Sequence, residues 1–171
     1  MPRFCREATR PFAAGTVSAS RSAVRGAPRL GREAAAEALA PLAAGADVVI
    51  ASPDELTLLG DGPPDRTAAR LLDGGATEVV VKNGDEARSY TADGARAVPA
   101  HRVDPVDSIG AGDAFVAGYL SGLLDGLDAE ARLRRAHTVG AFAVLTRGDW
   151  EGLPRRDELD LIGLREGAAL R

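Results

Sequence analysis

The sequence is poor in cysteine and in aromatic residues. Cys5 is its only cysteine, and aromatic side chains make up 4% of its 171 residues. A single thiol excludes both an internal disulfide and a cysteine cluster around a structural zinc ion. We therefore expect a protein of the cell interior, located in the cytoplasm.

Long apolar runs and an excess of positive charge are also missing. The longest apolar strings, around DVVIA and TEVVV, fall short of the roughly 20 residues that a membrane-spanning helix needs. The formal net charge is -4, and no concentrated basic face is present that would suit nucleic acid or an anionic membrane surface. We expect neither nucleic acid nor a membrane as a partner, and the composition favours a small soluble ligand.

The first 30 residues lack the hydrophobic period of a helix or a strand. They are rich in Arg, Ser, Ala and Gly. We predict that residues 1–30 are disordered or do not belong to the domain, and that the domain occupies residues 31–171. A hydrophobic content of 45% is sufficient for the core of one such domain.

From Gly31 onward, helix and strand patterns alternate. The string REAAAEALAPLAAGA predicts a helix that closes on Gly45, and DVVIAS predicts a short buried strand. A short helix in PDELTLLG and another in DRTAARLLDGG lead to a second strand, TEVVVK. Both strands are apolar without alternation, which is typical of parallel strands covered on both faces. The pattern indicates a layered α/β fold.

The second half of the chain predicts a hairpin followed by helices. Two extended pieces flank the turn at Ala92, Asp93 and Gly94, which suggests a hairpin at the sheet edge. Apolar residues at helical spacing follow Gly112 and stop at Gly126. A second helix is predicted from about residue 128 to about residue 146, and a short terminal helix after RGDWEGLP.

The segment DSIGAGDAF, residues 107–115, is the candidate catalytic motif. Gly110, Ala111 and Gly112 precede a long helix, so several backbone N–H groups can point at one spot without an intervening side chain. The helix dipole adds positive charge there, which suits a phosphate group. Asp113 would repel phosphate but could receive the proton of a hydroxyl. The alternative is a plain tight turn, and the complete string followed by an amphipathic helix favours phosphoryl transfer.

This segment resembles the C-terminal signature of the ribokinase-like (PfkB) carbohydrate kinases, D-T-x-G-A-G-D-x-F, and the resemblance extends over about residues 32–161. It implies a ribokinase-like three-layer αβα sandwich that uses ATP with Mg²⁺ to phosphorylate a sugar hydroxyl. Asp113 matches the catalytic base of the family. Gly110, Ala111 and Gly112, with the Asp113 amide, match the anion hole. Asp107 matches an acid near the nucleotide and, in some members, a monovalent cation such as K⁺.

Three further segments are similar to family elements. ASPDELTLL resembles the NxxE element, with Ser52 at the Asn position, and Glu55 would organise Mg²⁺ through water or be only a first-turn helix acid. VVVKNGDEA resembles a strand end at the nucleotide, which makes Lys82 and Gly84 candidate ATP contacts; a solvated lysine is the alternative. AHTVGAFAV matches the adenine-pocket helix, where His137 is a nucleotide contact or an ordinary surface histidine.

The segment TRGDWEGLP most resembles 2-keto-3-deoxygluconate kinases, and it makes Asp149, together with Asp113, a candidate contact to a sugar or sugar acid. We therefore expect an ATP-dependent kinase that prefers 2-keto-3-deoxygluconate. Two alternatives stay open: a catalytically inactive, nucleotide-binding remnant, and a PfkB kinase for another sugar such as fructose or ribose.

Nothing in the first 30 residues resembles the N-terminal half of the family, which supplies strand one, the lid and most sugar contacts. The resemblance therefore predicts a fold truncated at its N-terminal side, without a lid. Family dimers are often built through the lid, so a homo-oligomer is left open.

Overall fold

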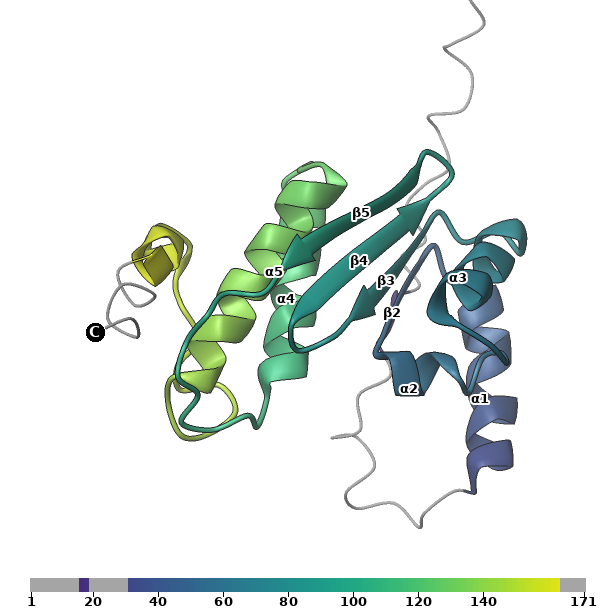
Figure 1. Ribbon diagram of the computed structural model, residues 1–171, viewed down its shortest axis with the longest axis horizontal. Coiled ribbons are helices and arrows are strands. Elements are labelled where there is room, and N and C mark those ends of the chain that lie inside the picture. Colours follow the sequence, from purple (N-terminus) through teal and green to yellow (C-terminus); the bar gives the residue numbers. More distant parts are fainter. Residues whose placement is uncertain (1–15, 19–30, 164–171) are drawn as a thin grey trace, which may run out of the picture.

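The computed structural model describes residues 16–18 and 31–163, which form one mixed sheet between two layers of helices (Figure 1). The five strands lie in the order β1-β2-β3-β4-β5. Their bounds are β1 (Thr16–Ser18), β2 (Val48–Ala51), β3 (Glu78–Lys82), β4 (Glu86–Thr91) and β5 (Gly94–Pro99). The first three strands pair in parallel, and β4 and β5 continue the sheet as an antiparallel hairpin whose second strand forms the edge.

Helices cover both faces of this sheet (Figure 1). One face carries α1 (Arg32–Ala44), α2 (Pro53–Leu56) and α3 (Pro64–Asp73), and the other carries α4 (Ala111–Leu124) and α5 (Ala129–Val144). A 3₁₀ helix, η2 (Arg156–Leu161), follows. No helix among the described residues is long and apolar enough to cross a membrane.

A separate hydrophobic core lies on each face of the sheet. Val79 and Val81 pack with the α2 and α3 side, whereas Val80 packs with Phe115 and Tyr119 of α4. Side chains alternate along a strand, so an unbroken apolar run supplies both faces. This confirms the layered α/β prediction from the DVVIA and TEVVV strings.

The predicted elements from residue 31 onward are present, with two changes in form. Helix α2 ends at Leu56, four residues before the predicted Gly60, and the terminal helix is a 3₁₀ helix. Strand β1 was not predicted, because three residues are too few to show a period. The prediction for the rest of residues 1–30 lies outside the described residues.

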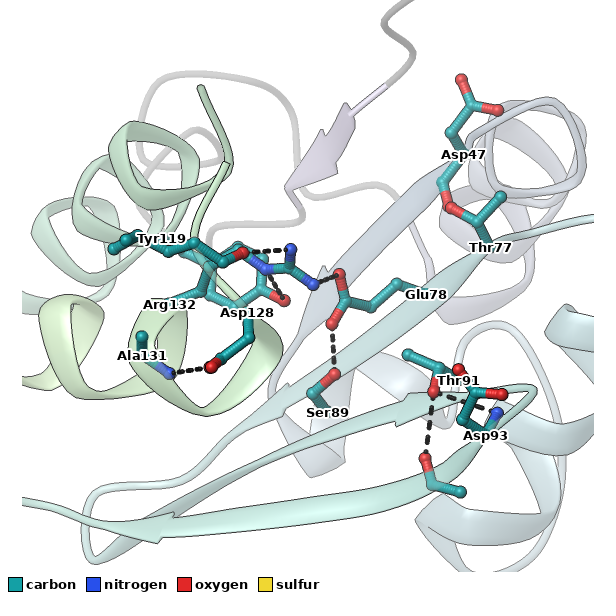
Figure 2. A network of polar contacts seen from close by, with 12 residues as sticks. Asp47, Thr77, Glu78, Ser89, Thr91, Asp93, Tyr119, Asp128, Ala131 and Arg132 are labelled. Atoms are coloured by element: carbon teal, nitrogen blue, oxygen red, sulfur yellow. Dashed lines mark hydrogen bonds and ion pairs between the residues drawn. The ribbon is translucent and has the colours of Figure 1, made fainter. Parts of the chain in front are cut away.

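A buried polar network joins α5 to the sheet (Figure 2). Arg132 of α5 donates to Glu78 at 2.7 Å and to the Tyr119 hydroxyl at 3.2 Å. Its third nitrogen donates to the Leu127 carbonyl at 2.9 Å, and Ser89 donates to the other Glu78 oxygen. Burial, and secondarily Glu78, raise the pKa of Tyr119 well above its usual range, so this phenol stays protonated.

Candidate active site

A cavity of about 900 Å³ lies where the carboxyl end of β3 meets the N-terminus of α4. Its walls come from the turn after β3 (residues 82–85), the segment after β5 (residues 99–105), the start of α4 and the inner face of α5. Of the predicted site residues, five line it: Lys82, Gly84, Ala111, Gly112 and His137. Segments distant in sequence thus converge on one hollow of a size usual for small-molecule sites.

The N-terminus of α4 is shaped by Gly110, which has a left-handed backbone with φ of 77°. A side chain on Gly110 would collide with the backbone of Asp149, whose Cα would lie 2.8 Å from the added carbon. Within the described part of the chain, the amides of Gly112 and Asp113 have no hydrogen-bond acceptor, whereas Ala114 already donates to the Gly110 carbonyl. Two N–H groups are therefore available to an anion.

Asp113 lies in the first turn of α4 and is exposed. Its side chain does not line the cavity, whereas its neighbour Gly112 does. The carboxylate is therefore beside the predicted phosphate position and open to a second reactant.

Asp107 joins the two loops that flank this helix start. One carboxylate oxygen accepts from the Ile109 amide at 3.1 Å, and the other accepts from the Gly148 amide at 3.3 Å. These hydrogen bonds, the Ile109 one first, lower the pKa of Asp107 below its ordinary value. The contact to Gly148 also fixes the next residue, Asp149, whose backbone packs on Gly110 while its side chain is exposed.

Lys82 and Glu55 form an ion pair beside the helix start. The Lys82 Nζ lies 3.5 Å from Glu55 Oε2, and the side chains are 14% and 11% exposed. The same nitrogen lies 3.6 Å from the position that a Cβ on Gly112 would occupy. Lys82 is therefore not the solvated lysine of the alternative interpretation.

His137 is buried, so the interpretation of this residue as an ordinary surface histidine is wrong. Its Nε2 lies 3.0 Å from the Val98 carbonyl, which can only accept, so this nitrogen carries the proton. The ring packs edge-on against Phe115 at 5.2 Å between centroids. Burial lowers the pKa of His137. His137 lines the cavity as a neutral, aromatic wall.

A profile of the pfkB family carbohydrate kinases matches residues 22–156. The chain belongs to this family. The match begins ten residues before the segment on which the resemblance was recognised. It includes the strand ends, the cavity and the start of α4 described above.

Two curated relatives of the chain are named for different substrates. The chain is 38% identical over 104 residues to 2-dehydro-3-deoxygluconokinase of Bacillus subtilis, covering 60% of this chain and 32% of that protein. It is 32% identical over 98 residues to the ribokinase of the same organism, covering 57% of this chain and 33% of that protein. The chain thus spans about a third of the length of these curated relatives.

A solved structure of a putative ribokinase II from E. coli, in complex with ATP and Mg²⁺, superposes with a TM-score of 0.71 at 34% identity. The match covers 75% of this chain and 42% of that one. This similarity confirms the ribokinase-like α/β fold.

Sequence reasoning missed one wall of the pfkB cavity. The segment after β5, residues 99–105, is not among the predicted site residues, yet the structure folds it over α5, where His101 Nε2 lies 3.0 Å from the Thr138 hydroxyl. Ser108 also lines the cavity. A segment of irregular backbone has no period, so only its position after an edge hairpin could have indicated this role.

The residues present suit a nucleotide whose Mg²⁺ is held mainly by phosphates. Among residues 16–18 and 31–163, no three His, Cys, Asp or Glu side chains gather into a metal site. Mg²⁺ commonly binds through substrate phosphates, water and one or two carboxylates. Glu55 Oε2 pairs with the Lys82 ammonium, and the role of Glu55 in organising Mg²⁺ through water stays a prediction.

Proposed function

We propose that the protein is an ATP-dependent kinase that transfers the γ-phosphate to a hydroxyl of a sugar or sugar acid, with 2-keto-3-deoxygluconate preferred. One observation carries the proposal: the DSIGAGDAF segment forms the start of α4 and borders the 900 Å³ cavity. Family membership and the B. subtilis 2-dehydro-3-deoxygluconokinase relative support the substrate class. The proposal includes a cytoplasmic location, where ATP is available.

Different groups of the chain would bind the transferred phosphate and the acceptor hydroxyl. The amides of Gly112 and Asp113 would hold the transferred phosphate, aided by the positive end of the α4 dipole. The Asp113 carboxylate would orient the acceptor hydroxyl and take its proton as the new oxygen–phosphorus bond forms and ADP leaves. Mg²⁺ on the nucleotide would supply further charge neutralisation.

The remaining predicted residues surround this centre. Lys82, Gly84 and His137 line the cavity and are proposed to contact ATP. Asp149 is proposed to approach the sugar acid, because its backbone packs on the start of α4. A monovalent cation near Asp107 stays a prediction. It is supported by the structure of a Vibrio cholerae fructokinase double mutant in a form bound to fructose, ADP and potassium, which matches with a TM-score of 0.65 at 28% identity over 74% of this chain and 44% of that one.

The test is ATP-dependent phosphorylation of 2-keto-3-deoxygluconate by the purified chain, with fructose and ribose alongside. Asp113→Asn should lower the rate about 10²- to 10⁴-fold, because removal of a general base costs that much. Nucleotide binding should persist in this variant, since Asp113 does not line the cavity. A rate unaffected by Asp113→Asn would refute the assignment of the base.

A second function, nucleotide binding without turnover, is favoured by the cavity lining: the candidate nucleotide contacts Lys82, Gly84 and His137 line the cavity, whereas the candidate base Asp113 does not. It predicts ATP binding by the folded chain and no phosphorylation of any of the three sugars. Phosphorylation that is lost in Asp113→Asn would exclude it.

A further inference from the structure

Asn83 carries the only side-chain amide of the chain. The sequence has no other asparagine and no glutamine, and the residue that follows Asn83 is a glycine. Asparagine is thermolabile, and it loses its amide most readily before glycine, because glycine has no Cβ to hinder the approach of its backbone nitrogen to the asparagine Cγ. Asn83 and Gly84 both line the cavity of about 900 Å³, so a change of charge here would act on a bound ligand.

The turn between β3 and β4 brings the two reacting groups together. The Gly84 amide donates to Asn83 Oδ1 at 2.8 Å. The Gly84 nitrogen therefore lies no more than about 4 Å from Asn83 Cγ, because the carbonyl bond adds only about 1.2 Å. The Asn83 backbone is held as well, through its own amide, which donates to the Glu86 carbonyl at 2.9 Å. The folded turn thus places the nucleophile beside the carbon that it would attack.

Water and hydroxide can reach this turn, and the Gly84 peptide has room to move. Asn83, Gly84 and Asp85 are exposed. A Cβ added at Gly84 would meet no atom within 4 Å, and Gly84 is not among the glycines with positive φ. Neither a neighbouring group nor an unusual backbone conformation therefore opposes ring closure at Asn83.

We propose that Asn83 is a deamidation site in the cavity and that its conversion weakens the binding of anionic ligands. The Gly84 nitrogen gives its proton to hydroxide and attacks Asn83 Cγ. The new C–N bond closes a cyclic imide, the bond from Cγ to Nδ2 breaks, and ammonia leaves with a proton from water. Water then opens the imide at either carbonyl to give aspartate or isoaspartate. The net reaction consumes a water molecule, releases an ammonium ion and creates a carboxylate.

The product would change the cavity in two ways. A new carboxylate beside Lys82 would repel a polyphosphate; this effect rests on the proposed function, which supplies that ligand. Isoaspartate also adds a carbon to the main chain of the turn. The Asp85 carbonyl accepts from the Ala100 amide at 2.9 Å, at the start of the segment after β5. A longer turn would therefore shift a second wall of the cavity.

The first test follows the mass of the full chain during incubation in mildly alkaline buffer. The mass gain on replacement of NH₂ by OH reports Asn83 alone, and isomerisation of Asp–Gly pairs leaves the mass unchanged. We expect the folded chain to convert at least as fast as the chain unfolded in guanidinium chloride. Gly84→Ala should slow conversion about 10-fold or more, because its Cβ hinders the attack. The matched control, Gly31→Ala, also places a Cβ in open space and should convert at the native rate.

The second test measures pyrophosphate and ATP binding by calorimetry before and after the incubation. The incubated chain and fresh Asn83→Asp should both bind pyrophosphate about 10-fold more weakly, because each carries an added like charge in the cavity. The loss should shrink at high salt, which screens that repulsion. Gly84→Ala should keep its own starting affinity through the same incubation.

Two results would overturn the inference. One is a folded chain that converts more slowly than the unfolded chain, because the turn would then protect Asn83. The other is an Asn83→Asp chain that binds pyrophosphate as tightly as the native chain. A chain that converts and loses pyrophosphate binding as expected but phosphorylates no sugar would refute the proposed function and leave this inference intact.

Discussion

The two ends of strand β3 carry charged residues on the same face of the strand, Glu78 and Lys82, and the ion pairs that these residues form differ in geometry. At the amino end, Glu78 and Arg132 are 2.7 Å apart, and every guanidinium nitrogen and both carboxylate oxygens have partners (Figure 2). At the carboxyl end, Lys82 and Glu55 are 3.5 Å apart. The first pair is therefore closer and makes more hydrogen bonds than the second.

The presence of a cavity does not distinguish the two ends of β3. A second hollow of about 700 Å³ borders Glu78 and Arg132, against about 900 Å³ beside Lys82. The difference lies in the hydrogen bonds already made: Arg132 donates from each of its three nitrogens, whereas Lys82 donates one hydrogen bond, to Glu55. We therefore expect the pair at the amino end to stabilise the fold, and ligand binding at the carboxyl end stays a prediction.

Removal of Arg132 should give the largest loss of stability. Arg132→Ala leaves the Glu78 carboxylate, 5% exposed, without its cation, and breaking a buried pair in this way costs about 3–5 kcal/mol. Urea denaturation measures the effect. The double variant Glu78→Leu/Arg132→Met should recover most of the loss, and a double variant as unstable as Arg132→Ala would contradict this account.

Gly110→Ala should come next, and it should affect both stability and binding. A left-handed backbone strains a non-glycine residue, at a cost of about 1–3 kcal/mol, and the added methyl group meets the Asp149 backbone. Displacement of the α4 start should also weaken pyrophosphate binding. Gly126→Ala, another positive-φ glycine with no atom near the added carbon, controls for strain alone and should leave binding unchanged.

Acidification should lower the free energy of unfolding by a smaller amount, through protonation of His137. Burial lowers its pKa below the ordinary 6.5, so the unfolded chain takes up the proton first as the pH falls. This contribution to stability is complete above about pH 6.5 and declines as the pH falls from there toward the lower folded-state pKa. Unfolding free energies measured between pH 8 and pH 5 should show a shallower decline in His137→Gln than in the native chain.

Lys82→Met should have the smallest effect on folding. The pair is loose and faces a cavity, so we expect a change in unfolding free energy of no more than about 1 kcal/mol. The same urea titration used for Arg132→Ala provides the comparison. A loss as large as that of Arg132→Ala would show that both ends of β3 are structural.

The sequence determined the local elements and the identity of the motif. The unbroken apolar strings predicted covered parallel strands, Gly45 and Asp128 marked helix ends, and DSIGAGDAF predicted the helix start that the structure contains. These features depend on neighbours in the chain, through periodicity, capping and backbone freedom. The family resemblance drawn from them is confirmed by the match over residues 22–156.

Tertiary structure alone decided which distant side chains meet. Glu55 and Lys82 are 27 positions apart, and Glu78 and Arg132 are 54 apart. Nothing in either local pattern indicates its partner. Strand alternation places Glu78 and Lys82 on one face of β3, but the packing of α2, α4 and α5 around the sheet determines that Glu78 meets Arg132 and Lys82 meets Glu55. Long-range packing decides these pairings, because each joins elements that meet only in the folded chain.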